Sequence, residues 1–321
     1  MIDRVEAVGP HEVEITTKSP YGILHRKLAT FMIMSQKYVQ AHGDDHQAEH
    51  PNGTGPYKLL EWIKGDHLTL VANEEYFRGA PDVKKVIVRP LTNDATRTAA
   101  LLSGEVHIID DLPVRDVERV KAHEGVETVS RPGLRLIYLQ MDQDREHSPK
   151  AKGPDAKNPF LKKEVRQAIY TGIDEEAIVQ HVMNGYGFAA GQFCPTAVFG
   201  YDDSIQRPPY DPEKAKDLLR QAGYPDGFEV TIDSPNDRYV NDEKIAQAVA
   251  ASLAKIGIKI SVNAIPKKTF FPMTDRRESS FFLIGWSCGD GDASAFLDGI
   301  AHTYDPEEGY GRYNRGRYSN P

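Results

Sequence analysis

Residues 234–239 (Ser-Pro-Asn-Asp-Arg-Tyr) combine polar, charged and aromatic side chains that could contact a small ligand. They follow an expected strand over 228–233 and precede an expected helix over 241–256. The N-terminal end of a helix offers N–H groups and positive potential to an anion, and the Arg238 guanidinium could hold a carboxylate through two hydrogen bonds. The same residues could serve only as a turn and a helix cap. The ligand contacts predicted here are Asn236, Arg238 and Tyr239.

A second candidate stretch is 285–292 (GWSCGDGD), which brings an indole, a thiol and carboxylates together. It overlaps the end of an expected strand over 281–286. Trp286 could form an aromatic wall of a binding site, or it could simply pack in the core. The further ligand contacts predicted here are Trp286, Cys288 and Asp290.

His42, His46 and His50 recur at every fourth position. On one helix this spacing would align three imidazoles, an arrangement suited to zinc or nickel. Gly43 weakens such a helix and Pro51 ends it, so a solvated loop is the favoured reading and no metal ligand is predicted. A metal carrier of the nickel type is kept as an alternative function.

Enzyme motifs give no support for a chemical step. Residues 185–190 (GYGFAA) match the dinucleotide fingerprint formally, but that motif needs a preceding strand, and the segment 175–183 before it is expected to be helical. The sequence holds no HExxH, CxxC or P-loop pattern. We therefore predict no catalytic residue and no cofactor, although a hydrolase triad scattered along the chain is left open.

Composition narrows the class of protein. The 321 residues are 40% hydrophobic and 27% charged, which is typical of a globular protein large enough for two domains. A net charge of −8 argues against nonspecific nucleic-acid binding. No apolar run reaches the ~18 residues of a membrane span, and the N-terminus lacks the basic and apolar regions of an export signal.

The candidate residues must be positioned by alternating strands and helices. Turn residues around Lys64-Gly65-Asp66 predict a hairpin, with its second strand over 68–72. A strand pair is expected within 4–18. Further strands are expected over 83–89, 106–109, 134–141, 228–233, 258–262 and 281–286, and helices over 94–104, 114–123, 163–171, 175–183, 211–223 and 241–256. The succession from 228 to 262 favours parallel strands with a right-handed crossover.

The hairpin segment also carries a family resemblance. The run PNGTGPYKLLEWIKGDHLTLVANEEYFRG from Pro51, the run YDPEKAKDLLRQAGYPDGFEV from Tyr210 and the final RYSNP resemble the extracytoplasmic solute-binding proteins of family 5, which serve peptide, nickel and opine ABC importers. The resemblance implies a carrier rather than an enzyme. It also implies an α/β fold of the type II periplasmic-binding-protein kind, with mixed sheets, two lobes and a hinge.

The resemblance further implies how the chain is organised and with what it works. We expect residues 1–140 to form a partial lobe I, 141–290 to form the ligand-binding lobe II, and 291–321 to return towards lobe I. Family members are longer at both ends, so a fragment is expected, with an export signal in the missing N-terminal part and a periplasmic location. The expected partners are a small-molecule or peptide ligand and the membrane permease with its ATPase subunits, and no nucleic acid.

One departure from the family bears on specificity. In peptide-binding relatives, a Gly-Trp-x-x-Asp run supplies an aspartate to the peptide ammonium group, but Gly289 stands at that position here. We therefore expect a peptide or a peptide-like, possibly anionic, solute. The resemblance also places Cys194 and Cys288 at the border of the binding cleft. A disulfide between them is conceivable, with two separate thiols the safer assumption.

Overall fold

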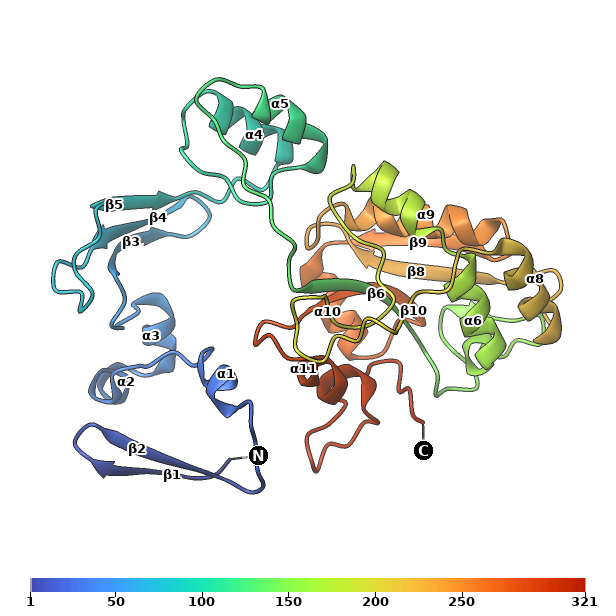
Figure 1. Cartoon of the computed structure of the whole chain (residues 1–321), viewed down its shortest axis with the longest axis horizontal. Helices are drawn as coiled ribbons and strands as arrows, with labels where there is room; N and C mark the ends of the chain where they lie inside the picture. The colour runs from blue at the N-terminus through green and yellow to red at the C-terminus, as the bar shows by residue number, and fades with distance from the viewer. Residues whose placement is uncertain (1, 321) are drawn as a thin grey trace. The chain divides into compact units, whose positions relative to one another are not determined.

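A computed structural model describes residues 2–320 and divides the chain into two compact units. Unit 1 runs to Ile109 and unit 2 begins at Asp110 (Figure 1). The predicted first segment begins at Met1 and the predicted last segment ends at Pro321. These two residues lie outside the described residues. The division of the chain at 140 and 290 stays a prediction.

Unit 1 is built from two antiparallel sheets and short helices. Strands β1 (Ile2–Gly9) and β2 (Glu12–Thr17) form the strand pair expected within 4–18. The predicted hairpin is also confirmed, because β3 pairs with β4 around Gly65, whose φ of +87° suits glycine. The other elements of unit 1 and the bounds of the hairpin are α1 (Leu24–Leu28), α2 (Gln36–His42), α3 (Asp44–Glu49), β3 (Tyr57–Ile63), β4 (His67–Ala72), β5 (Lys85–Val88) and α4 (Asp94–Leu102).

Two local predictions around α4 are wrong. The strand expected over 106–109 does not form, because the Val106 N–H donates to the Ala100 carbonyl at the end of α4 (3.1 Å) and pairs with no strand among the described residues. The N-cap of α4 lies one residue earlier than expected, since the Asn93 side chain accepts from the Thr96 N–H (3.0 Å).

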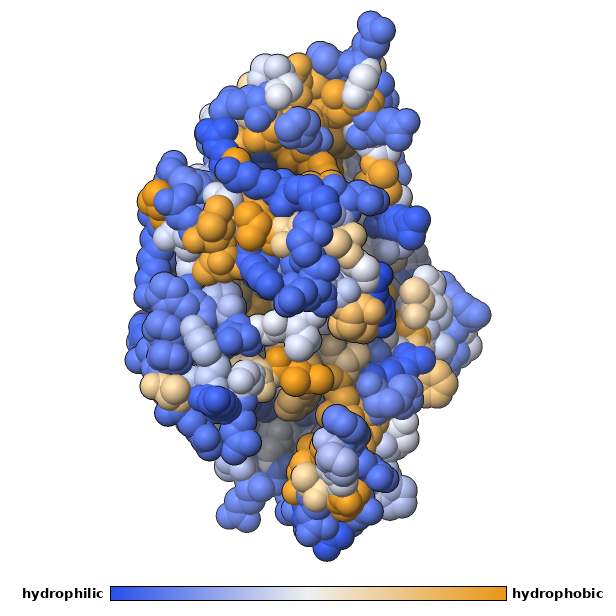
Figure 2. Space-filling view, turned by 90° about the vertical axis from the view of Figure 1, so that its left-hand side faces the viewer, coloured by the Kyte–Doolittle hydropathy of each residue, from blue (hydrophilic) through white to orange (hydrophobic). Residues whose placement is uncertain are grey.

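Unit 1 buries very little apolar surface. Of its described residues, Ala100 is the one apolar residue that is fully buried. The register of the β3–β4–β5 sheet places an apolar set on one face, and Trp62 and Val88 at its rim are exposed. Phe31, Met32 and Ile33 are also exposed. Apolar side chains are accordingly visible on the surface in Figure 2.

Unit 2 is organised around a mixed five-stranded sheet. Strand β10 (Phe281–Ser287) lies between β6 (Arg135–Met141), to which it is antiparallel, and β8 (Glu229–Pro235), to which it is parallel. β8 also pairs with β9 (Lys259–Ile265) in parallel and with the short β7 (Ala151–Lys152) in antiparallel orientation. Helix α9 (Asp242–Ala254) connects β8 to β9, so the predicted parallel crossover is confirmed.

Helices cover both faces of this sheet. Phe281 and Leu283 of β10 belong to the main core, with side chains from α6 and α8. Phe282 and Ile284 point to the opposite face and pack with Phe270 of α10. The helical elements of unit 2 besides α9 are η1 (Val114–Asp116), α5 (Val117–Lys121), η2 (Pro159–Leu161), α6 (Lys163–Gly172), α7 (Glu175–Ala177), η3 (Ile178–Val182), α8 (Pro212–Gln221), α10 (Lys267–Asp275), α11 (Ser294–Phe296) and η4 (Leu297–Ala301).

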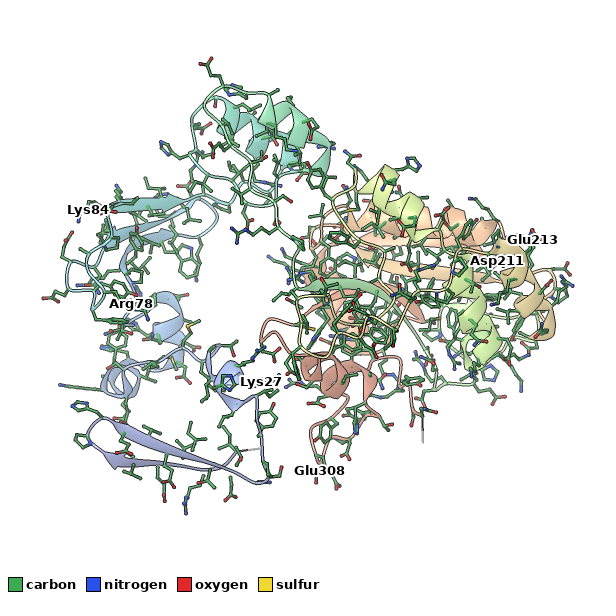
Figure 3. All side chains as sticks on the ribbon, viewed as in Figure 1. Lys27, Arg78, Lys84, Asp211, Glu213 and Glu308 are labelled. Atoms are coloured by element: carbon green, nitrogen blue, oxygen red, sulfur yellow. The ribbon has the colours of Figure 1, made fainter. Side chains whose placement is uncertain are left out.

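The start of α8 forms as its sequence predicts. The Asp211 carboxylate accepts from the Lys214 N–H (2.9 Å), Pro212 occupies the first turn, and Glu213 follows (Figure 3). Gly223 ends the segment with φ +84°. None of the helices within residues 2–320 combines the length and the apolar character that crossing a membrane requires.

Candidate functional site

The turn after β8 is held by backbone and side-chain hydrogen bonds. The Asn236 N–H donates to the Ile265 carbonyl (3.1 Å), and the Lys267 N–H donates to Asp237 Oδ1 (2.6 Å). The buried Asp242 carboxylate accepts from the N–H groups of Arg238 (3.0 Å) and Tyr239 (2.9 Å). These bonds give residues 236–239 a defined path at the carboxyl end of β8, an edge at which open α/β sheets commonly bind ligands.

The N-terminal end of α9 does not offer the open anion site that its sequence suggests. Asp242 Oδ1 also accepts from the Glu243 N–H (3.0 Å), so its carboxylate already satisfies three amide groups at this end. Burial raises the pKa of Asp242, while these hydrogen bonds oppose the rise by favouring the carboxylate. An anion bound here would therefore be held by side chains rather than by the helix end.

Tyr239 connects this turn to the end of β10. Its hydroxyl donates to the Gly285 carbonyl (3.3 Å), and a Cβ at Gly285 would lie only 2.9 Å from Tyr239 Cε1 and 2.7 Å from Ile137 Cδ1. The lack of a side chain at Gly285 thus makes room for the Tyr239 ring. The Arg238 guanidinium carbon lies 5.4 Å from the ring centroid, within the range of a cation–π contact.

Trp286 and Cys288 belong to a different cluster. Successive side chains of a strand point to opposite faces, so Trp286 lies on the other face of β10 from the position of Gly285. Its ring contacts Tyr313 (centroids 4.9 Å apart), and its buried Nε1 has no hydrogen-bond partner among the described residues. Cys288 is buried in the same cluster together with Cys194 and Phe296.

Asp290 and the two thiols have local roles in the structure. Asp290 Oδ1 accepts from the Asp292 N–H (3.2 Å), which shapes the turn that follows Cys288. No disulfide joins Cys194 to Cys288, both of which lie within the described part of the chain. Burial raises the pKa of the Cys194 thiol, so this side chain resists ionisation.

The six predicted contacts therefore fall into two groups, and whether they bind ligand stays a prediction. Arg238 and Tyr239 gather at the end of β8 with the exposed Asn236 beside them, whereas Trp286, Cys288 and Asp290 belong to the segment at the end of β10.

Sequence reasoning missed Arg135, whose guanidinium carbon lies 5.6 Å from the Tyr239 centroid. It also missed the exposed Ser287, which pairs with Arg135 across β10 and β6. The alternation of side chains along β10 is the sequence signal that could have separated Ser287 from Trp286 and Cys288.

The histidine segment is helical, so the loop predicted there is wrong. Ser35 caps α2 by accepting from the Tyr38 N–H (3.3 Å), and Gly43, with φ +81°, joins α2 to α3 rather than abolishing the helix. The rings of His42 and His46 stack with centroids 4.8 Å apart, and those of His46 and His50 at 4.5 Å. Within residues 2–320, no group of three histidine, cysteine or carboxylate side chains is placed to hold a metal ion.

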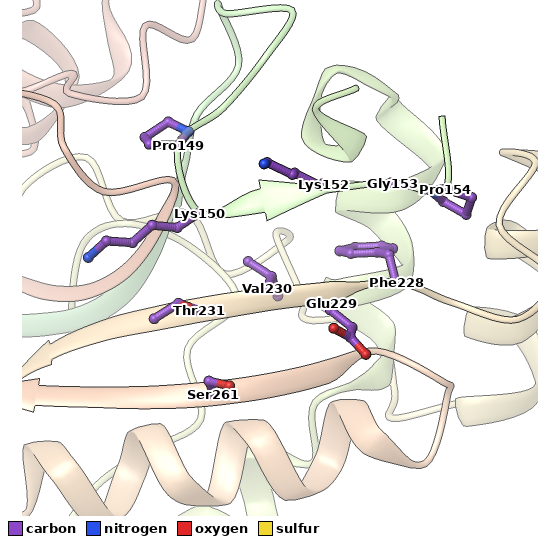
Figure 4. Close-up of a pocket in the computed structure, with 10 residues that line it drawn as sticks. All are labelled: Pro149, Lys150, Lys152, Gly153, Pro154, Phe228, Glu229, Val230, Thr231 and Ser261. Carbon is purple, nitrogen blue, oxygen red and sulfur yellow. The ribbon is translucent and has the colours of Figure 1, made fainter. Parts of the chain in front are cut away.

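Two hollows lie away from Tyr239. A cavity of about 500 Å³ opens in unit 2 between the segment around β7 and the first residues of β8 and β9, at the end of β8 remote from Tyr239 (Figure 4). Its lining includes Lys150, whose ammonium group pairs with the fully buried Asp233 carboxylate (2.7 Å). A second hollow of about 480 Å³ lies in unit 1 beside His50 and Tyr57. Neither hollow is lined by a predicted ligand contact.

Comparison with known proteins gives a consistent result. Residues 1–307 match the family model of bacterial extracellular solute-binding proteins, family 5 Middle. The chain is 30% identical over 330 residues to the glutathione-binding protein GsiB of Salmonella paratyphi A, covering 99% of this chain and 60% of GsiB. It is 29% identical over 276 residues to heme-binding protein A of Haemophilus influenzae, covering 84% of this chain and 47% of that protein.

Solved structures show the same likeness in three dimensions. The periplasmic binding protein DppA of Helicobacter pylori, in complex with the peptide STSA, superposes with a TM-score of 0.80 at 28% identity, covering 92% of this chain and 56% of DppA. The binding protein AgaA of A. tumefaciens R10, in complex with agropinic acid, gives a TM-score of 0.73 at 28% identity over 95% of this chain and 59% of AgaA. The chain spans about 60% of the length of GsiB. The predicted fold class, α/β with mixed sheets of the type II periplasmic-binding-protein kind, is confirmed.

Proposed function

Because this chain belongs to the family 5 bacterial extracellular solute-binding proteins, we propose that it is part of the substrate-binding component of an ABC importer and captures a peptide or peptide-like solute. The observation that carries the proposal is the family match over residues 1–307. GsiB is named for glutathione binding, and DppA was solved with a peptide, so relatives with this fold bind compounds of the proposed class.

The local geometry supports an acidic solute. Arg238 is exposed at the carboxyl end of β8, beside the half-buried Tyr239. A guanidinium binds a carboxylate through two parallel hydrogen bonds, and an aromatic ring adds apolar contact area. Gly289 stands at the position where the family resemblance implies an aspartate that binds the ammonium group of a peptide. The proposed solute is therefore held more by its anionic end than by its cationic end.

The proposed mechanism is capture without a chemical step. A solute that contacts both lobes only in a closed state shifts the protein towards that state, because it binds that state more tightly. The loaded protein then delivers the solute to a membrane permease, whose ATPase subunits supply the energy. The proposed location is periplasmic or otherwise extracytoplasmic.

Native mass spectrometry of the protein purified from its source tests the proposal, because a co-purified solute adds its own mass to the complex. We expect peptides or peptide-like acids to be released on denaturation. Recovery of sugars alone would contradict the proposal. Titration calorimetry with glutathione and with the peptide Ser-Thr-Ser-Ala provides an independent check, with a neutral disaccharide as the negative control.

A further inference from the structure

Two arginines from distant parts of the chain approach the same tyrosine ring. Arg135 is the first residue of β6, and Arg238 lies in the turn after β8. Their guanidinium carbons lie 5.6 Å and 5.4 Å from the centroid of the Tyr239 ring. Both cations therefore lie beside the same ring.

Both guanidinium groups keep an uncompensated charge in the described part of the chain. Within residues 2–320, the ion pairs include neither Arg135 nor Arg238, and both side chains are exposed. Some other arginines of unit 2 do form ion pairs, among them Arg277 with Asp144 (2.8 Å) and Arg315 with Asp275 (2.7 Å). An anion that contacted both guanidinium groups would therefore not have to compete with a carboxylate of the described residues.

The ring that both arginines contact is fixed in place. The Tyr239 hydroxyl donates to the Gly285 carbonyl, and its N–H donates to the buried Asp242. A guanidinium that lies over an aromatic ring keeps the N–H groups at its edge available for hydrogen bonds. The ring thus limits the positions of both cations without using their donors, which lowers the entropy lost when they bind an anion.

We propose that Arg135 and Arg238 together form a two-arginine site for a carboxylate of the transported solute, with Arg135 as a specificity-determining residue. This inference rests on the proposed solute-binding function and narrows it to acids. The exposed hydroxyl of Ser287, which pairs with Arg135 across the two strands, is a further donor on the same face.

Titration calorimetry on the 321-residue chain tests the site with two matched pairs of probes. One pair is glutathione and its diethyl ester, and the other is the peptide Ser-Thr-Ser-Ala and its C-terminal amide. We expect the acids to bind about ten-fold or more tightly than the blocked compounds. Arg135→Gln should weaken binding of the acids by about ten-fold or more and should leave binding of the blocked compounds nearly unchanged.

Two further variants separate a binding role from a structural one. Arg135→Lys keeps the positive charge but cannot form the bidentate hydrogen bonds of a guanidinium. Its affinity for the acids should therefore lie between that of the unaltered chain and that of Arg135→Gln. Lys255→Gln is the matched control, because Lys255 is an exposed cation 5.6 Å from the Tyr210 ring, at the other end of α9. Lys255→Gln should change neither the affinity for the acids nor the affinity for the blocked compounds. Thermal unfolding of each variant shows that the fold is kept.

The possible failures can be told apart. If acids and blocked compounds bind equally well, or if Arg135→Gln binds the acids as tightly as the unaltered chain does, the two-arginine site is wrong while the proposed function stands. If the unaltered chain binds neither acid, the result counts against the proposed function itself, and the two-arginine site falls with it.

Discussion

Gly285 shows how a single position controls the candidate site. A methyl group there would overlap with Tyr239 and Ile137, at 2.9 Å and 2.7 Å, so any side chain would displace the ring that Arg135 and Arg238 share. The position of the ring beside the two arginines therefore depends on a residue that has no side chain. In the proposed site, Gly285 would act by leaving room for the Tyr239 ring and not by contacting the ligand.

Two histidines of unit 1 should titrate in opposite directions from the ordinary value of 6.5. Partial burial and the neighbouring His50 and His42 lower the pKa of His46. Hydrogen bonds to the Asp66 and Glu61 carboxylates raise the pKa of His67. Imidazole NMR signals should therefore show a midpoint below 6.5 for His46 and above 6.5 for His67.

These directions set the sign of the effect on stability. His46 favours folding above its unfolded-state pKa, and this contribution is lost as the pH falls through its lowered folded-state pKa. His67 favours folding below its unfolded-state pKa, and this contribution is lost as the pH rises through its raised folded-state pKa. Asp66→Asn should bring the His67 midpoint down and leave His46 unchanged. A His46 midpoint at or above 6.5 would contradict the first assignment, and a His67 midpoint at or below 6.5 would contradict the second.

At the scale of elements, β10 organises unit 2. It pairs with β6 on one side and β8 on the other, and its alternating side chains contribute to clusters on both faces of the sheet. Its carboxyl end brings Gly285 to the turn after β8 and places Trp286 on the opposite face. The two groups of candidate residues are therefore linked by one strand although they face different surroundings.

Helix α8 allows a test of how much its N-cap residue contributes to the stability of unit 2. Asp211 satisfies the Lys214 N–H, while Ala215 and Leu219 of the same helix are buried in the main core. Asp211→Ala should lower the free energy of unfolding of unit 2 by about 1 kcal/mol. The measurement is urea denaturation, followed through a spectroscopic signal that reports on unit 2. Asp211→Asn keeps a capping oxygen and should cost much less. An unchanged midpoint for Asp211→Ala would show that packing alone holds the start of this helix.

At the scale of the whole molecule, the two units differ in the cores that they contain. The main core of unit 2 is one cluster that includes Phe160, Leu219, Ile232 and Leu283. Among the described residues of unit 1, Ala100 alone is a fully buried apolar residue, and one face of the β3–β4–β5 sheet carries apolar side chains with an exposed rim. Burial of apolar area is the main favourable contribution to folding, so the units should differ in stability.

Amide hydrogen exchange measures this difference directly. We expect amides of β3, β4 and β5 to exchange much faster than those of β8, β9 and β10, because unit 1 opens at a lower free energy. A hydrophobic dye should bind the folded chain through the exposed apolar residues of unit 1. A single sharp unfolding transition, equal protection in both sheets and no dye binding would together contradict this expectation.

Local patterns in the sequence were sufficient for much of the secondary structure and for the family. The Lys64-Gly65-Asp66 turn, the cap at Asp211 and the periodicity of α6 and α9 depend on neighbouring residues, so they can be read without the fold. The strand expected over 106–109 failed because strand formation needs a partner, which a local pattern does not supply. The histidine helices were missed because a glycine can connect two helices as well as end one.

The grouping of the candidate residues was decided only by the tertiary structure. The sequence by itself identified a solute-binding family and the segments 234–239 and 285–292, because residue type and spacing are properties of the chain. It did not reveal that Arg135 lies beside Tyr239, since strand pairing brings together residues that are far apart along the chain. Nor did it separate Trp286 from Tyr239, because the side to which a residue points matters only once the two faces of the sheet have been assigned.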